Sequence, residues 1–286
     1  MTLPTLPTLP TRLTLLTSHT SLRYRVLTAA ALVASATSAL GAQTIADRVS
    51  RAGNGSVRMS FATRPEVCGR GGNIHRGGNW HGNFGNDSRN YTRDVEWDAA
   101  CDYGPGRLVL DKRDGEIVAL RFYVGGRWRP SSDGVTDLGD VSAKEAADYL
   151  VSLASTLPGK AGRDAIFPAT IADSATVWPA LLRLARNDER PRETRKQAVF
   201  WLGQAAGEAA SAGLDSLSQD ATVDREVQKQ VVFALSQRPR DEGIPILIRV
   251  ARTHRDPEVR RDAVFWLGQS NDPRAIALFE EILTKR

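Results

Sequence analysis

Histidine, cysteine and methionine are scarce in this chain of 286 residues, which contains four, two and two of them. Apart from His19 near the N-terminus, the histidines are His75, His81 and His254. The motif His-Glu-x-x-His, the motif Gly-x-Ser-x-Gly and the phosphate-binding loop are all missing, which excludes the enzyme classes that depend on them. No strand-then-helix pattern surrounds the glycines at 69–72, so they do not form a dinucleotide-binding fingerprint.

Acidic residues are absent from residues 1–42, which contain three arginines. An Ala-rich apolar run at 26–40 follows the arginines and ends in the small residues Gly41 and Ala42. This layout is typical of a secretory signal peptide, and we expect cleavage after Ala42. The run is shorter than the roughly 20 residues of a membrane span, so no stable span is expected after cleavage. The alternative is that the segment stays uncleaved as an anchor.

A large excess of one charge is also missing from the part that would remain. The segment takes away three of the 38 basic residues and none of the 33 acidic ones, so the remaining chain is close to neutral. The basic net charge of the whole chain therefore does not support a nucleic-acid partner. The expected location is the periplasm of a bacterium or the extracellular space.

A heptapeptide that occurs twice organises the C-terminal half. Residues 198–204 and 263–269 both read Ala-Val-Phe-Trp-Leu-Gly-Gln, and residues 231–237 read Val-Val-Phe-Ala-Leu-Ser-Gln, a worn copy. The copies follow one another after 33 and 32 residues, a period typical of stacked helix pairs. Apolar-periodic segments upstream, such as 181–186 and 247–252, supply the first helix of each pair.

Helix-boundary signals agree with this period. Gly203 and Gly268 stand where a helix C-terminus favours a left-handed residue. Two aspartate–proline pairs place a capping carboxylate before a proline in the first helical turn. These pairs are Asp256-Pro257 and Asp272-Pro273.

A fourth, degenerate copy of the repeat lies upstream. Residues 165–167 precede the first full copy by 33 residues, and Ser142 with Glu145 predicts a capping box at the start of the preceding helix. In such a box each side chain satisfies the backbone N–H of the other residue. At the far end, 275–283 is typical of a first helix with no second. Residues 142–286 therefore predict about four helix pairs plus a closing helix, a solenoid with atypical ends.

The pattern Arg-x-x-Ala-Val-x-x-Leu-Gly at 195–203 and 260–268, with the Asp-Pro turns, resembles the HEAT-like repeat. This armadillo-like helical repeat is also seen in bilin-lyase-type proteins. The resemblance covers about half of the chain and implies an α-solenoid. It implies less about function, because the family includes many scaffolds and a few enzymes whose chemistry needs additional residues.

Residues 43–141 have a different pattern, which predicts a small β domain of about four strands and resembles no family. Residues 69–90 are rich in glycine, asparagine and arginine and are expected to form a long loop. An Asp-Gly turn at 114–115 predicts a hairpin. The other expected elements are a helix at 44–51 and strands at 57–61, 91–97, 107–112 and 116–124.

Cys68 and Cys101 are the only cysteines, and in an exported chain such a pair predicts a disulfide. The bond would close the Gly/Asn-rich loop and contribute roughly 3–4 kcal/mol in the chain-entropy model. The alternative, a redox role, lacks a Cys-x-x-Cys motif.

The second helix of each repeat carries a phenylalanine at one fixed position and a glutamine one helical turn later. We predict that stacking aligns these residues into a ladder on the concave face, where solenoids bind peptides or partner helices. The alternative is that each phenylalanine packs between adjacent repeats. The predicted ladder comprises Phe200, Phe233, Phe265, Gln204, Gln237 and Gln269, with Phe167 at the same position of the degenerate fourth copy.

The predicted loop at 69–90 offers weaker candidate sites. His75 and His81 match no familiar zinc spacing, so we predict no metal or other cofactor. The aromatic residues Trp80, Phe84 and Tyr91 are suited to stacking on a sugar or peptide, or to folding back over the sheet. His254 lies in a turn between repeat helices, where a lone histidine is expected to be polar surface.

The sequence thus predicts an α+β, mainly α chain: a signal peptide at 1–42, a disulfide-bonded β domain at 43–141 and a HEAT-like solenoid at 142–286. The main functional hypothesis is a non-enzymatic, exported scaffold that binds a protein or peptide on the concave face. The first alternative is a module that binds envelope glycans or peptides through the β-domain loop. The second is a lyase-like enzyme, which lacks a recognisable nucleophile or acid–base pair.

Overall fold

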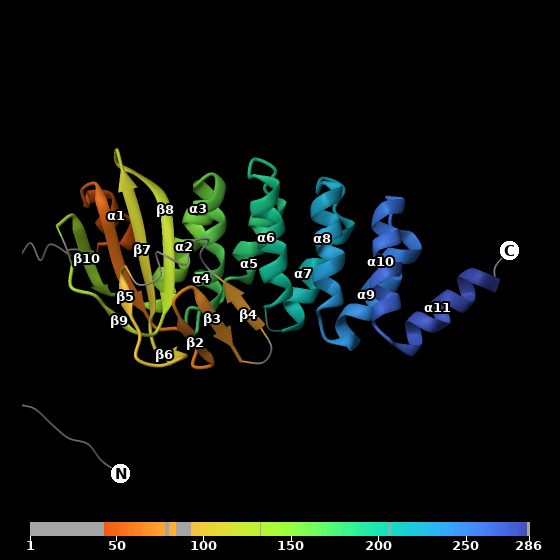
Figure 1. The fold of residues 1–286 in the computed structure, drawn as a ribbon. Helices are drawn as coiled ribbons and strands as arrows, with labels where there is room; N and C mark the ends of the chain where they lie inside the picture. Colours follow the sequence, from red (N-terminus) through yellow and green to blue (C-terminus); the bar gives the residue numbers. More distant parts are fainter. Residues whose placement is uncertain (1–42, 78–79, 84–92, 132, 206, 285–286) are drawn as a thin grey trace, which may run out of the picture. The chain divides into compact units, whose positions relative to one another are not determined.

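The structure is a computed structural model that describes residues 43–77, 80–83, 93–131, 133–205 and 207–284 (Figure 1). The chain divides into two compact units, Met1–Gly41 and Ala42–Arg286, and the described residues all belong to the second. The expected signal segment lies outside the described residues, so its cleavage stays a prediction. None of the helices in the described part of the chain is long and apolar enough to cross a bilayer.

A short helix and three small sheets form the N-terminal region. Helix α1 (Ile45–Arg51) begins at the N-cap Thr44, whose side chain exchanges hydrogen bonds with Asp47 in a capping box. The first sheet has the strand order β10-β1-β7-β8, with β10 parallel to β1 and the other neighbours antiparallel. Its strands are β1 (Gly55–Phe61), β7 (Gly106–Arg113), β8 (Glu116–Val124) and β10 (Val135–Asp140).

The predicted hairpin between β7 and β8 is confirmed. Its turn residues Asp114 and Gly115 have φ angles of 54° and 82°. Two consecutive positive φ angles are what a tight two-residue hairpin turn requires, and Asp-Gly accepts them with little strain. The alternating side chains of β8 then place Leu120 and Phe122 in the core.

The prediction of a long loop at 69–90 is wrong for the part of this range that the structure describes. Three short strands occur there and pair with β6 in the order β4-β3-β2-β6, while β5 pairs with β9 in a separate ribbon. Backbone pairing needs no apolar side chains, and here the fully buried Ile74 and the disulfide between Cys68 and Cys101 fix the position of the strands. The bounds are β2 (Val67–Arg70), β3 (Asn73–Arg76), β4 (Trp80–Asn83), β5 (Val95–Glu96), β6 (Asp102–Tyr103) and β9 (Arg127–Trp128).

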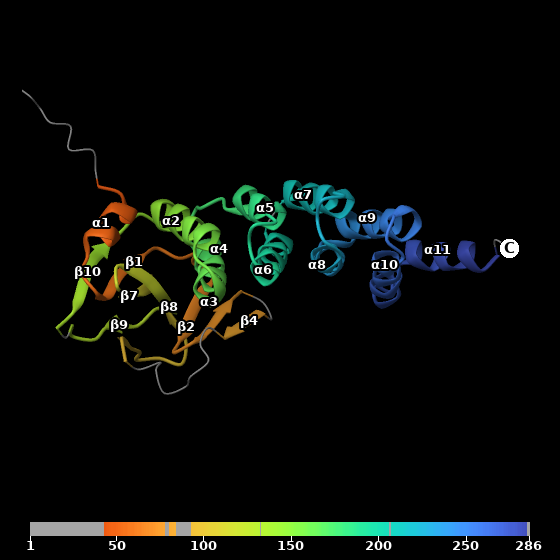
Figure 2. The same cartoon turned by 90° about the horizontal axis from the view of Figure 1, so that it is seen from above.

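The C-terminal region is a stack of helix pairs followed by α11. Helices α5, α7 and α9 form one row, and the second helices α6, α8 and α10 form the other (Figure 2). Each helix contacts both its own partner and the next helix of its row. The bounds are α2 (Ala143–Thr156), α3 (Gly159–Asp164), α4 (Ile166–Ile171), α5 (Trp178–Arg186), α6 (Arg192–Gly203), α7 (Glu208–Gln219), α8 (Arg225–Ser236), α9 (Arg240–Thr253), α10 (Pro257–Gln269) and α11 (Pro273–Thr284).

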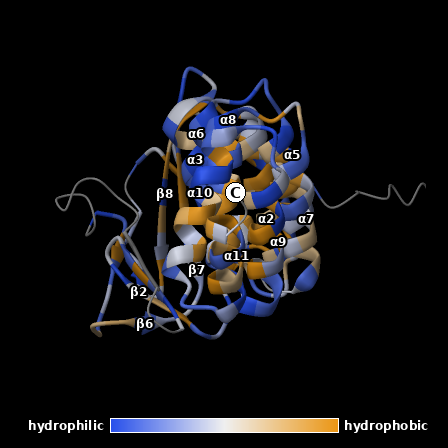
Figure 3. Ribbon diagram, turned by 90° about the vertical axis from the view of Figure 1, so that its right-hand side faces the viewer, coloured by the Kyte–Doolittle hydropathy of each residue, from blue (hydrophilic) through white to orange (hydrophobic). Residues whose placement is uncertain are grey.

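These observations confirm the α+β class, with a mainly helical C-terminal region after a small β region. Apolar residues lie between the two rows of helices, whereas the connecting loops are hydrophilic (Figure 3). The core is continuous from the first sheet into the helices. Phe61 stacks on Phe122 at 5.8 Å between ring centroids, Phe122 contacts Phe167 at 6.3 Å, and Phe167 contacts Trp201 at 4.7 Å.

The predicted capping box at Ser142 is only half formed. The Ser142 hydroxyl accepts a hydrogen bond from the Glu145 N–H, as expected. The Glu145 carboxylate instead accepts the N–H of Ile45, the first residue of α1, at 2.9 Å. A free N–H at a helix start can be satisfied by any nearby acceptor, and here a tertiary partner replaces the local one.

The prediction that Gly203 and Gly268 are left-handed is also wrong. Both lie inside their helices, and neither has a positive φ angle. Gly203 is buried where α6 approaches α8, and a Cβ on it would stand 2.9 Å from the Cβ of Ala234. Gly268 is exposed, and its nearest neighbour would be the Phe279 ring at 4.0 Å. The two glycines therefore differ in their surroundings: Gly203 has no room for a Cβ against α8, whereas Gly268 has room for one.

Alanine at these two equivalent glycines should have opposite effects. Gly203→Ala should lower the free energy of unfolding by about 1–3 kcal/mol, because α6 and α8 would have to move apart. Gly268→Ala should raise it by about 0.5–1 kcal/mol, because alanine favours a helix interior and has room there. Urea unfolding of both variants measures the difference. Equal effects of the two substitutions would contradict this account of the repeat contact.

Candidate protein-binding face

Phenylalanine side chains of one repeat pack on tryptophans of the next. Phe167 contacts Trp201 at 4.7 Å, and Phe233 contacts Trp266 at 5.1 Å. Phe200 has no such partner, because the worn copy carries Ala234 at the tryptophan position, and its ring meets the edge of Trp201 at 5.0 Å. The rings therefore join neighbouring repeats, as the packing alternative predicted.

The same rings are not fully buried. Phe200 and Phe233 are half-buried, and Phe265 is 57% exposed. Phe167, in contrast, is completely buried beneath the first sheet. Each of the three ladder phenylalanines thus combines a packed side with an accessible edge, and the ladder begins at Phe200.

The three glutamines follow the ladder phenylalanines by four residues, about one helical turn. Gln204 is half-buried, and Gln237 and Gln269 are exposed. They lie at or just beyond the C-terminal ends of the second helices. We call the set Phe200, Phe233, Phe265, Gln204, Gln237 and Gln269 the second-helix face. The binding role of this face stays a prediction.

Ion pairs between repeats lie at the turns and use many of the repeat arginines. Arg195, which is 8% exposed, pairs with Asp224 of the next repeat at 2.6 Å. Arg225 pairs with Asp256 at 2.5 Å, and this hydrogen bond lowers the pKa of the Asp256 carboxyl. Exposed pairs contribute less than about 1 kcal/mol each, a bound that applies to the exposed Arg225 more than to the buried Arg195. These arginines thus connect the turns of neighbouring repeats.

His254 is buried, so the prediction of a surface histidine is wrong. Its Nε2 lies 2.9 Å from the carbonyl oxygen of Ser218, in the preceding repeat, and its Nδ1 accepts the N–H of Asp256. With Nδ1 as acceptor, the proton of the neutral ring is on Nε2 and is donated to Ser218. The ring thus joins the C-terminal ends of α7 and α9, a role that sequence spacing does not reveal.

The β region contains a buried polar network that sequence analysis missed. Asp94 accepts hydrogen bonds from Arg121 at 2.7 Å and from the Tyr123 hydroxyl at 2.8 Å. Burial is the main cause that raises the pKa of Tyr123, and Asp94 adds to it. A tyrosine with a raised pKa does not give up its proton near neutral pH. The network therefore holds β8 against the segment that contains Asp94. A tyrosine in this state is unsuited to acid–base catalysis.

The candidate residues of the predicted loop are only partly described. The register of β3 and β4 places His75 directly opposite His81. No group of three or more His, Cys, Asp or Glu residues that could hold a metal occurs among the described residues. Trp80 begins β4, and Phe84 and Tyr91 lie outside the part of the chain that the structure describes. The predicted disulfide between Cys68 and Cys101 is confirmed.

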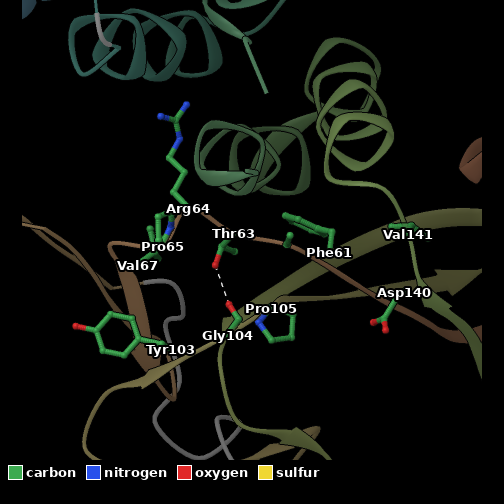
Figure 4. A pocket seen from close by; sticks show the side chains of 11 residues that line it. Phe61, Thr63, Arg64, Pro65, Val67, Tyr103, Gly104, Pro105, Asp140 and Val141 are labelled. Carbon is green, nitrogen blue, oxygen red and sulfur yellow. Dashed lines mark hydrogen bonds between the residues drawn. The ribbon is translucent and has the colours of Figure 1, made fainter. Parts of the chain in front are cut away.

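Hollows of about 560 and 370 Å³ adjoin the segment between β1 and β2. The larger, of about 560 Å³, is apolar and lies among Phe61, Pro65, Tyr103 and Pro105 (Figure 4). Its rim residue Tyr103 is 69% exposed. The second, of about 370 Å³, lies between this segment and helices α4–α6, and includes Gln204 of the second-helix face.

Comparison with known proteins agrees with the repeat architecture. Residues 220–286 match the family described as HEAT repeats. Residues 220–286 are therefore HEAT-like repeats, and the match does not extend to the earlier helices or to the β region. No curated protein matches the chain. HEAT repeats suggest a protein-interaction or scaffold role and are generally non-catalytic.

Alanine substitutions at equivalent phenylalanines should separate the packed rings from the exposed one. Phe233→Ala should lower the free energy of unfolding by about 1.5–3 kcal/mol, because it removes the contact with Trp266 and half-buried apolar area. Phe265→Ala should change it by less than about 1 kcal/mol, because that ring faces solvent. Chemical unfolding measures both. A cost for Phe265→Ala as large as for Phe233→Ala would contradict the described packing.

Proposed function

We propose that this HEAT-like chain is a non-catalytic, exported interaction protein that binds a peptide or an extended protein segment along the second-helix face. The observation that carries the proposal is the row of half-buried or exposed phenylalanine edges, one per repeat, each with an amide one helical turn away. Accessible aromatic edges and half-buried or exposed amides of this kind are suited to an extended chain, which presents both apolar side chains and backbone hydrogen-bonding groups.

The spacing of the repeats fits such a ligand. Packed helices lie roughly 8–10 Å apart, and an extended peptide rises about 3.3 Å per residue. One repeat therefore corresponds to about three peptide residues. A chain lying across α6, α8 and α10 would meet one phenylalanine and one glutamine at each step.

Export is supported by the disulfide between Cys68 and Cys101. Such bonds persist in oxidising compartments and are rare in the cytosol, where thiols are kept reduced. Together with the N-terminal pattern of arginines, an apolar run and small residues, the disulfide favours the periplasm or the extracellular space.

A peptide-selection experiment tests the binding face. Random peptides are selected on the native protein, and affinities are then compared for two triple variants made only of exposed residues. The first, Gln237→Ala with Phe265→Ser and Gln269→Ala, changes the second-helix face. The control variant changes the row of first helices at Arg183, Gln219 and Thr253, each to Ala. These positions are exposed on α5, α7 and α9.

We expect the first variant to weaken binding at least about tenfold, or 1.4 kcal/mol, because it removes amide and aromatic contacts. The control should bind like the native protein. Thermal unfolding of both variants verifies that they remain folded. Selected peptides that bind both variants equally well would refute the proposed face.

Expression of the full chain in a bacterium tests export. The protein should be recovered from the periplasm or medium with Gln43 as its first residue and with Cys68 and Cys101 oxidised. Intact-mass analysis before and after thiol labelling measures both properties. Full-length protein in the cytosol with two free thiols would contradict the proposed location, and full-length protein in the membrane fraction would favour the uncleaved anchor.

A further inference from the structure

A cleft with two arginines lies where the second-helix face meets the β region. Its volume is about 370 Å³, within the range of roughly 300–1,000 Å³ that ligand sites occupy. Arg64 and Arg76 come from the β region, and Trp178, Trp201 and Gln204 come from the helices. A smaller adjoining hollow of about 290 Å³ shares Arg76, Trp201 and Gln204 with it.

Backbone hydrogen bonds hold the two walls of this cleft together. The N–H of Arg64 donates to the carbonyl of Ile171 at 3.0 Å, and the N–H of Asp173 donates to the carbonyl of Ala62 at 2.9 Å. Thr63 and Ala172 form a β-bridge between the same segments. The cleft is therefore a fixed feature of the fold, because these bonds join the segment after β1 to the segment after α4.

The guanidinium of Arg64 makes few hydrogen bonds for a charged group that is partly buried. Its side chain points away from the apolar hollow and towards the helices (Figure 4). The only side-chain hydrogen bond that the described residues give it is a long one, 3.4 Å from Nη2 to the carbonyl of Ala175. Its Nε is buried without a hydrogen-bond partner. A buried donor on a charged group without a partner is costly, so this geometry favours an anion in the cleft.

The surrounding charges agree with an anionic ligand. The residues that line the cleft itself include no carboxylate. Glu66 lines the adjoining hollow and lies 3.6 Å from Arg76, a long ion pair with the carboxylate partly exposed. Asp173, next to the cleft, accepts the hydroxyl of Ser174. Two arginines thus line a cleft whose own lining has no carboxylate, and Glu66 forms a long ion pair with Arg76 from the adjoining hollow.

We propose that this cleft binds the C-terminal carboxylate of the peptide that occupies the second-helix face; the inference rests on that proposed function. Guanidinium groups bind carboxylates through paired charge-assisted hydrogen bonds. Gln204 belongs to both the cleft and the face, so a chain that follows the face enters the cleft at this residue.

The position of the cleft explains why a chain end is the expected occupant. The preceding phenylalanine, Phe167, is completely buried beneath the first sheet, so the face does not continue beyond Phe200. The β region with Arg76 stands at this end of the face. A peptide that reaches Gln204 therefore ends there, with its last side chain against Trp178 and Trp201 and its carboxylate beside the arginines.

Two pools of randomised hexapeptides test this assignment, one with a free C-terminal carboxylate and one with a C-terminal amide. Binding of each pool is measured by ligand-observed NMR to the native protein and to the variants Arg64→Gln and Gln204→Glu. The second variant adds a negative charge at the cleft on a partly exposed helix end. The control Arg183→Gln removes an exposed arginine of α5 outside the cleft.

We expect the native protein and the control to bind the free-acid pool at least about tenfold more tightly than the amide pool. Both cleft variants should lose this preference, and Arg64→Gln, which lies outside the second-helix face, should still bind the amide pool. Retention of the preference in a folded Arg64→Gln variant would overturn the assignment. Equal binding of the two pools by the native protein would overturn the assignment but leave the proposed function standing. Failure of both pools to bind would contradict the proposed function as well.

Discussion

The structure depends on a chain of aromatic contacts that runs from the first sheet into the helix stack. Phe61, Phe122, Phe167 and Trp201 touch in series, and the same Phe-on-Trp contact recurs between Phe233 and Trp266. Because a helix pair cannot bury its apolar side alone, each repeat needs the next, and the sheet covers the first one. This packing holds the candidate face and the two-arginine cleft in fixed positions on one core.

The packing also determines which part of each phenylalanine remains available. Inter-repeat contacts bury one side of Phe233 and leave an edge, whereas Phe265 is mostly exposed. Structural and binding roles are therefore compatible in the same residue, and the two alternatives drawn from the sequence are not exclusive. Substitutions at exposed members of the face separate the two roles, which substitutions at packed members cannot do.

The helical repeats could be predicted from the sequence because their period, caps and apolar stripes are local and recur. The disulfide and the hairpin turn at Asp114–Gly115 followed from equally local rules. The pairing of β2 with β6, the partner of Glu145 and the role of Gly203 could not be predicted, because each depends on a distant segment. The cleft was missed for the same reason: Arg64 and Gln204 are 140 positions apart in the numbering and meet only in the fold.

Hydrogen–deuterium exchange with and without the free-acid peptide pool tests the central claim most directly. Binding along the second-helix face predicts slower exchange at the C-terminal ends of α6, α8 and α10 and in the segments 62–66 and 172–176 beside the cleft. The first helices α5, α7 and α9 should exchange as in the free protein. Protection confined to the first helices or to the β5–β9 ribbon would contradict the account.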